Sequence, residues 1–296
     1  MSGFHEKDCD CGNDCDCAGD HRGVEEMEMV SALFPLTSSE SKRLIAKGVA
    51  ALPEVRRALK KGRLVIAGGT TNAFVAEELL GVKLEKALYT AGIITGGKLC
   101  TTPPEKRIHP YCLKDGKPVD LGPAEMAAEF EAEDVFIKGA GAVDHEGHAG
   151  VLVASPNGGT IGTSMGHVLA RGAHLIVPVG LEKMVPSVID ASQSCGTTRF
   201  KYSYGASLGL IPLVNATVIT EIDALWLLTG VTATHVGSGG VGGSEGSVVL
   251  AVEGTEEEVD AAFNLIKSIK GEPPVEMVNR DCDDCTYDCT IGRRGA

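Results

Sequence analysis

Apolar residues recur at the period of a helix between residues 38 and 61. The apolar residues that give this period are Leu44, Ile45, Val49, Leu52, Val55 and Leu59. This spacing predicts a helical region whose N-terminus is capped by Ser38 or Ser39. Pro53 is expected to divide it into two helices, because proline cannot donate the backbone hydrogen bond that a continuous helix needs.

Short apolar runs then alternate with helical patterns. The predicted strands are 63–67, 86–91, 134–138, 150–154 and 174–179, and the predicted helices are 73–80, 123–131 and 160–171. Residues 92–122 show neither period and are interpreted as a long functional or mobile loop. The alternation predicts an α/β domain with a mostly parallel, Rossmann-like sheet and helices on both faces.

The pattern changes after about residue 206. Strands are expected at 216–220, 232–236, 247–252 and 274–278, and helices at 221–228 and 255–270. This order of elements is typical of a smaller ferredoxin-like α+β domain. Six glycines between residues 237 and 246 predict a mobile hairpin tip that resembles a lid.

Charge and cysteine are concentrated at the two ends of the chain. The formal net charge is −13 and there are ten cysteines, and residues 1–28 with 276–296 hold nine of the net negative charges and seven of the cysteines. We therefore predict an acidic Cys-rich tail at 1–28, the α/β domain at 29–205, the ferredoxin-like domain at 206–278 and a second Cys-rich tail at 279–296. The acidic balance argues against a nucleic-acid partner, which needs a basic face.

Nothing in the apolar pattern predicts a membrane partner. The longest apolar stretch, 208–219, is about twelve residues long and too short to cross a bilayer. The N-terminus is charged and has no apolar core of a signal peptide. A cytoplasmic location is the expectation.

Two glycine-rich turns join a predicted strand to a predicted helix. Such turns let backbone N–H groups and hydroxyls approach an anion. The candidate anion-binding residues are Gly69, Thr70, Thr71 and Asn72 in the first turn and Asn157, Gly158, Gly159 and Thr160 in the second. Both turns are expected at the carboxyl edge of the parallel sheet, where ligands bind. The alternative for the first is a plain turn that Thr71 or Asn72 caps.

Candidate acid–base residues are Lys138, Asp144 and His145. Lys138 leaves a buried strand and needs a partner, either Asp144 or an acidic substrate. Residues 144–148 read DHEGH, which suits a metal or a proton acceptor near neutral pH, or simply a solvated hairpin turn.

A polar stretch at 192–201 offers further candidates. Arg199 and Lys201 are expected to anchor a phosphate or carboxylate. Cys195 is a nucleophile if one of these cations lowers the pKa of its thiol, and otherwise an inert side chain.

The cysteines of the two ends have the spacing of metal ligands. The candidates are Cys9, Cys11, Cys15, Cys17, Cys282, Cys285 and Cys289. Closely spaced thiolates favour zinc, copper(I) or an iron–sulfur cluster, and we predict zinc or an iron–sulfur cluster here. The alternative is a pair of acidic tails with redox-active thiols.

Three segments of the body resemble the superfamily of ribose-5-phosphate isomerase, glucosamine-6-phosphate deaminase and CoA transferases. GTTNAFVAEEL at 69–79 is similar to the turn and helix that hold the sugar phosphate, DVFIKGAGAVD at 134–144 to the strand D-V-x-I-D-G-A-D-E-V-D, and HLIVPV with EKM at 174–184 to the late strand ending in S-K-L. IGT at 161–163 and the helix after it resemble the initiation-factor 2B and methylthioribose-phosphate isomerase group.

The resemblance implies the α/β fold, an oligomer and a small anionic substrate, phosphorylated or CoA-linked, with Lys183 among its ligands. The carboxylates of the isomerase are absent: Lys138 and Gly141 stand at its two aspartates, and Ser155 and Ser164 at its lysine and glutamate. Three functions therefore stay open: an isomerase- or transferase-like enzyme, a non-catalytic metabolite, redox or metal sensor, and a metal storage or delivery protein.

Overall fold

The computed structural model describes residues 28–276, 278, 285, 287 and 289. The predicted metal ligands Cys9, Cys11, Cys15, Cys17 and Cys282 lie outside these residues. The helices are α1 (Ser38–Ala51), α2 (Pro53–Lys60), α3 (Thr70–Leu80), α4 (Pro123–Ala128), α5 (Gly159–Ala170), α6 (Val188–Ser194), α7 (Glu221–Thr229) and α8 (Glu256–Ile269), with 3-10 turns η1 (Pro104–Lys106) and η2 (Leu181–Lys183). The strands are β1 (Met29–Leu36), β2 (Arg63–Ile66), β3 (Gly92–Thr95), β4 (Lys98–Thr101), β5 (Tyr111–Lys114), β6 (Lys117–Pro118), β7 (Val135–Ile137), β8 (Ala142–Val143), β9 (Ala149–Val153), β10 (His174–Pro178), β11 (Gly209–Leu213), β12 (Ala216–Ile219), β13 (Thr232–Gly239) and β14 (Ser247–Thr255).

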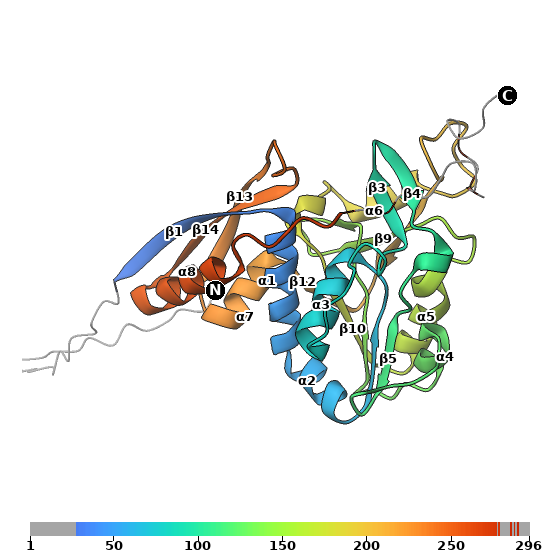
Figure 1. Ribbon diagram of the computed structural model, residues 1–296, viewed down its shortest axis with the longest axis horizontal. Coiled ribbons are helices and arrows are strands. Elements are labelled where there is room, and N and C mark those ends of the chain that lie inside the picture. Colours follow the sequence, from blue (N-terminus) through green and yellow to red (C-terminus); the bar gives the residue numbers. More distant parts are fainter. Residues whose placement is uncertain (1–27, 277, 279–284, 286, 288, 290–296) are drawn as a thin grey trace, which may run out of the picture.

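A six-stranded sheet forms the centre of the larger part of the molecule. Its strand order is β12-β10-β7-β2-β5-β6. The first four strands are parallel, and β5 and β6 continue the sheet in antiparallel pairing. Helices α1, α2 and α3 pack on one face, and α4 and α5 on the other (Figure 1). The predicted α/β class with helices on both faces is confirmed, and the sheet is mixed.

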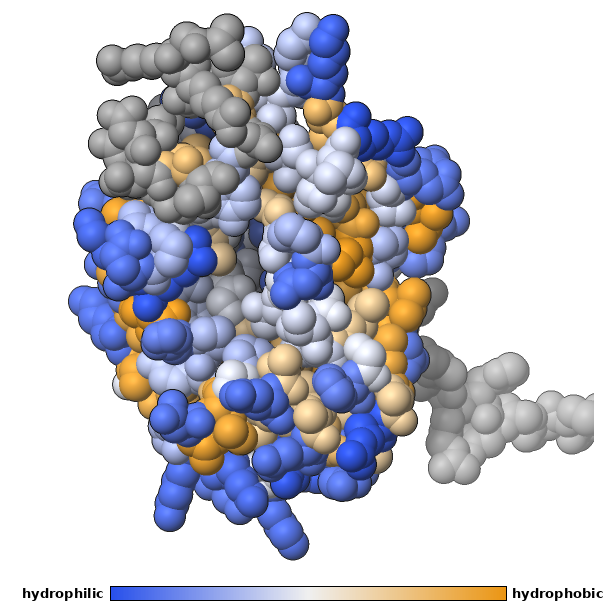
Figure 2. Space-filling model, turned by 90° about the vertical axis from the view of Figure 1, so that its right-hand side faces the viewer, coloured by the Kyte–Doolittle hydropathy of each residue, from blue (hydrophilic) through white to orange (hydrophobic). Residues whose placement is uncertain are grey.

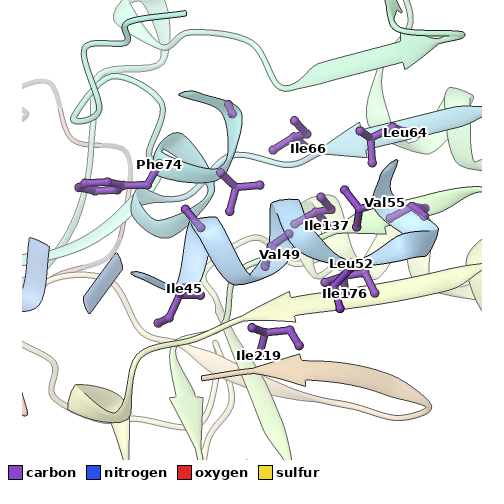
Figure 3. Close-up of a cluster of buried hydrophobic side chains, with 14 of the residues drawn as sticks. Ile45, Val49, Leu52, Val55, Leu64, Ile66, Phe74, Ile137, Ile176 and Ile219 are labelled. Atoms are coloured by element: carbon purple, nitrogen blue, oxygen red, sulfur yellow. The ribbon is translucent and has the colours of Figure 1, made fainter. Parts of the chain in front are cut away.

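The strands of this sheet are apolar on both sides, which is why helices cover both faces. Leu64 and Ile66 of β2 pack with Ile137 and Ile176 beneath α1–α3 (Figure 3). The intervening Val65 and its neighbours on β7 and β10 pack against α4 and α5. The period of two therefore assigns each strand residue to one of two fully buried cores.

Helix α1 begins at a capping box rather than at the predicted serine cap. The Thr37 hydroxyl accepts a hydrogen bond from the Glu40 N–H, and the Glu40 carboxylate accepts one from the Thr37 N–H. Pro53 begins α2 as predicted, at a position where a helix has no use for the missing N–H.

The smaller sheet takes its strands from opposite ends of the chain. Its order is β1-β14-β13, and β1 pairs with a strand more than 200 residues later. The predicted strand 216–220 is β12, which pairs with β10 in the large sheet. The small sheet therefore crosses the boundary predicted near residue 206. Its first strand was not predicted, because β1 is apolar on both sides and lacks the polar alternation of a half-covered strand.

Four further predictions about elements are wrong. Residues 86–91 form turns, and their buried Tyr89 donates a hydrogen bond to the Ile66 carbonyl. The presumed loop 92–122 contains β3 to β6. Residues 150–154 belong to a separate antiparallel sheet of order β11-β9-β8. The described residues of 274–278 form no strand.

Within the part of the chain that the structure describes, no helix is both long enough and apolar enough to cross a membrane.

Candidate functional site

Polar side chains gather where the parallel strands β2, β7, β10 and β12 end. We call this group the edge site and define it as Lys42, Asn72, Lys138, Glu182, Lys183 and Glu221. Carboxyl ends of parallel strands share one edge of a sheet, so residues from four separate strand ends come together there. The first turn of α1 supplies Lys42 to the same group.

Asn72 ties the start of α3 to the end of β7. Its amide Nδ2 donates to the Ala67 carbonyl at 2.7 Å and to the Ile137 carbonyl at 3.2 Å. The side chain is fully buried, and its Oδ1 has no hydrogen-bond partner among the described residues. A Cβ at Gly139 would lie 3.5 Å from this oxygen. The free oxygen therefore faces the turn that follows Lys138.

Lys138 and Lys183 bring two amino groups to neighbouring carbonyls. The Nζ of Lys138 donates to the Gly139 carbonyl at 2.9 Å, and the Nζ of Lys183 to the Ala140 carbonyl at 3.1 Å. Both side chains are partly exposed, and neither has a carboxylate within 4.0 Å among the described residues. The predicted ion pair of Lys138 with Asp144 is not formed.

Lys42 and Glu182 form an ion pair at the border of the edge site. Their Nζ–Oε1 distance is 2.6 Å, and both side chains are largely buried. Burial opposes ionisation of Glu182, but the charges of Lys42 and Lys183 outweigh it and lower the pKa of this carboxyl. The glycine-rich hairpin approaches the same pair, because a Cβ at Gly246 would lie 2.9 Å from Glu182 Oε2.

Glu221 closes the edge site from the first residue of α7. Its Oε2 accepts a hydrogen bond from the Leu181 N–H at 2.9 Å. Its Oε1 and the nearby Ser41 hydroxyl have no partner by hydrogen-bond geometry among the described residues. Complete burial raises the pKa of Glu221. The Glu221 carboxyl therefore holds a proton more readily than an exposed glutamate does.

The two lysines are less basic than free lysine. Burial lowers the pKa of Lys138 to about 8, and the positive charge of Lys183 adds to this effect. Burial and the charge of Lys42 lower the pKa of Lys183 to about 8 as well, against the opposing effect of Glu182 and Glu221. Two amines that release a proton near neutral pH are suited to acid–base and nucleophilic chemistry.

The first predicted anion turn, Gly69–Asn72, belongs to this site. Gly69 has φ 159 and precedes α3, whose N-terminus no side chain caps. The Thr71 hydroxyl is buried and has no partner among the described residues. Among the described residues, seven buried polar side-chain atoms have no partner, and those of Thr71 and Asn72 lie in this turn. Unpaired buried polar atoms are costly and mark places where a ligand completes the hydrogen bonding.

The second predicted turn follows a strand of the β11-β9-β8 sheet instead of the large parallel sheet. Asn157, Gly159 and Thr160 line an open hollow of about 290 Å³ together with residues around α4, from Gly122 to Glu125. Gly158 has φ 77 and precedes α5. The face that carries α4 and α5 shows scattered hydrophobic residues among hydrophilic ones (Figure 2). The second turn therefore does not follow a strand of the large parallel sheet, whereas the sequence pattern predicted that it would.

Asp144 has a structural role in the β8–β9 turn. Its carboxylate accepts from the N–H groups of Glu146, His148 and Val188 at 2.9–3.1 Å. These bonds and His148 outweigh burial and lower the pKa of Asp144. Asp144, Glu146 and His148 lie close enough to share a metal ion, whereas His145 is exposed and outside that group. The predicted hairpin turn is confirmed. Among the described residues, the predicted catalytic residues Lys138, Asp144 and His145 form no hydrogen bond between their side chains.

The remaining predicted ligands lie in exposed segments. Arg199 is exposed, and its guanidinium donates to the Gln193 carbonyl. Cys195 packs partly against the small cluster around Val188. Cys285 is exposed, and the Cys289 sulfur accepts from the Gly205 N–H at 3.1 Å. The zinc or iron–sulfur centre stays a prediction.

Sequence reasoning missed Lys42, Glu182 and Glu221. Glu182 belongs to the E-K-M segment at 182–184, in which the resemblance implies a ligand role for Lys183 alone. Glu221 follows a predicted strand. The rule that ligand-binding residues follow the carboxyl ends of parallel strands therefore indicates it as a candidate. The sequence carried no such signal for Lys42, because its position on α1 resembles that of an ordinary surface lysine.

Comparison with models of known protein families, with curated proteins and with solved structures finds no match.

Proposed function

We propose that the protein binds a small anionic metabolite, phosphorylated or CoA-linked, at the edge site and acts on it by acid–base chemistry. The observation that carries this proposal is the pair of amines at Lys138 and Lys183, each partly exposed and, among the described residues, hydrogen-bonded to a neutral carbonyl and to no carboxylate. Two adjacent positive charges without a carboxylate partner repel each other, and an anion between them removes that repulsion.

The start of α3 supports the anion assignment. Uncapped first-turn N–H groups carry partial positive charge and suit an oxyanion. Asn72 fixes this turn against the end of β7, so the N–H groups and Lys138 belong to one rigid arrangement. The Thr71 hydroxyl provides a further donor.

Finer features are part of the same proposal. These are a Rossmann-like α/β domain related to the sugar-phosphate isomerase and CoA transferase superfamily, a homo-oligomer in the cytoplasm and a zinc or iron–sulfur centre on the cysteine-rich ends. The lowered pKa of two amines favours an enzyme over the alternative of a non-catalytic sensor.

Calorimetric titration with a panel of sugar phosphates and CoA thioesters tests the binding. We expect saturable binding that Lys138→Gln or Lys183→Gln weakens about tenfold, consistent with loss of one charge-assisted contact. Lys267→Gln is the matched control, because Lys267 is exposed on α8 far along the chain from the edge site. Equal binding by all variants, or no binding across the panel, contradicts the proposal. Binding without turnover supports the sensor.

A further inference from the structure

The two amines of the edge site have different charged surroundings. Lys183 has Glu182 next to it in the chain and the Glu221 carboxyl nearby, and both favour its protonated form, whereas the charge of Lys42 opposes it. Among the described residues, the charge that acts on Lys138 is that of Lys183. Both amines therefore have a pKa of about 8, and of the two only Lys183 has carboxyls nearby, among the described residues, that support its ammonium form.

The backbone places these two unlike amines side by side. Gly139 and Ala140 are consecutive residues, and their carbonyls hold Lys138 Nζ and Lys183 Nζ respectively. The same turn faces the free Oδ1 of Asn72 at the start of α3. An anion seated at that helix start thus reaches a nucleophilic nitrogen and a proton donor together.

We propose that Lys138 is a nucleophile that forms an imine with an aldehyde or ketone group of the bound anion. This inference rests on the proposed function, because it uses the same site and adds a chemical class of substrate: a small phosphorylated or carboxylated carbonyl compound. Lys183 is the group that donates a hydrogen bond to the carbonyl oxygen.

The reaction balances with groups at the site. The Lys138 nitrogen forms a bond to the carbonyl carbon while the C=O π bond breaks, and the oxygen takes a proton from the Lys183 ammonium. The nitrogen, now positively charged, returns one proton to the Lys183 amine. Loss of the hydroxyl as water, with the second proton of the nitrogen, leaves the C=N bond. The net change is amine plus carbonyl giving imine plus water.

The lowered basicity of Lys138 supplies the reactive form. With a pKa of about 8, about one Lys138 in ten is neutral at pH 7. For a lysine with pKa of about 10.5 the corresponding fraction is roughly one in three thousand. Lys138 is therefore far more nucleophilic at neutral pH than the exposed lysines of the chain.

The test uses pyridoxal 5′-phosphate, an aldehyde that carries a phosphate, followed by borohydride to reduce the imine. Peptide mass spectrometry of the full chain is expected to find the adduct at Lys138 at least tenfold more than at exposed Lys267. The pH dependence of labelling is expected to have its midpoint near 8. Pyridoxal without the phosphate is expected to label Lys138 much less. Adduct spread evenly over the exposed lysines overturns the inference.

Two variants and one competitor separate the possible failures. Lys138→Arg is expected to abolish the adduct and keep the charge, and Lys183→Met to slow its formation by about tenfold. Pyridoxine 5′-phosphate, which has no carbonyl, is expected to bind by calorimetry and to block labelling. If it binds but no adduct forms at Lys138, the imine is excluded and the anion site stands. If it does not bind, the anion site itself is contradicted for this phosphate.

Discussion

At the scale of single residues, the charged form of Lys138 destabilises the folded protein relative to the unfolded chain. A side chain whose amine is held in a largely covered site loses hydration that it keeps in the unfolded chain. The pKa near 8 expresses this cost, since the folded protein binds the proton less tightly than the unfolded chain does. A charged side chain that destabilises the fold is typical of a functional site, because activity there is kept at the expense of stability.

We therefore expect Lys138→Met to stabilise the protein at pH 7 by on the order of 1 kcal/mol, after allowance for solvent screening. The folded-state pKa of Lys138 is lowered, so its cost is full below about pH 8 and disappears as the pH rises toward about 10.5. Denaturant unfolding at several pH values measures the difference. A variant that is less stable than the wild type at pH 7 would contradict the assignment.

Asn72 is expected to stabilise the fold by joining α3 to the ends of β2 and β7. Asn72→Ala removes both hydrogen bonds that join α3 to the ends of β2 and β7, and leaves the Ala67 carbonyl without its side-chain donor, while the Ile137 carbonyl keeps its bond from the Ala67 N–H. We expect a loss of about 2–3 kcal/mol in the free energy of unfolding. Asn264→Ala is the control on exposed α8, with an expected change within about 0.5 kcal/mol. Equal effects of the two substitutions would show that the Asn72 bonds contribute little.

At the scale of elements, much of the large sheet could be predicted from sequence and the partners of several strands could not. Helices with clear caps and stops, such as α3 ending at Gly81 and α8 beginning at Thr255, lie where they were expected. Residues 86–91 form turns although Ala87, Leu88 and Tyr89 make a short apolar run, which is also typical of a buried strand. Strand pairing depends on residues that are distant in sequence, and the local pattern of apolar residues gives no information about them.

Of the edge site, the glycine turn and both amines were predicted, whereas the acids were not. The turn at Gly69 and the strand end at Lys138 carry local signals of anion binding. The pKa of Glu221 is raised by burial, and this burial depends on how α7 packs after β12. Burial of a single carboxyl is a property of tertiary packing and has no local sequence pattern.

Helices α1 and α7 cross closely at Gly48. A Cβ at this position would lie 2.7 Å from the Ala224 Cβ and 2.9 Å from its Cα. We expect Gly48→Ala to destabilise the protein by roughly 1–3 kcal/mol, because the helices have to separate. Adding Ala224→Gly should restore part of the loss. Thermal unfolding of both variants measures this, and an additive double variant would argue against the close crossing.

At the scale of the whole molecule, Arg43 joins three parts of the chain. Its guanidinium lies 2.5 Å from Glu77 and 2.9 Å from Glu78 on α3, and 2.9 Å from Glu272, just after α8. The side chain is only 13% exposed. The segment after α8 therefore returns to the large sheet's helical layer, in dark red across α1 in Figure 1.

We expect Arg43→Ala to cost roughly 3 kcal/mol, since among the described residues it leaves the largely buried Glu272 without a cation and leaves Glu77 and Glu78 with Lys86 and Lys47 alone. Hydrogen exchange of residues 271–276 should rise at the same time. Arg57→Ala is the control, because Arg57 pairs with exposed Glu133 and should change stability by less than about 1 kcal/mol. Unchanged exchange after Arg43→Ala would show that the C-terminal segment is held by other contacts.

The pairing of β1 with β14 also determines the order in which this chain folds during synthesis. Residues 29–36 leave the ribosome first among the described strands, yet their partner is made more than 200 residues later. The large sheet, whose strands lie between them, has all its strands by residue 219, so we expect it to fold before β14 is available to the small sheet. Throughout that interval the exposed Leu33 and the free edge of β1 are open to other chains. Slow or interrupted translation between residues 219 and 255 thus prolongs the one stage at which a nascent chain of this protein is most prone to aggregate.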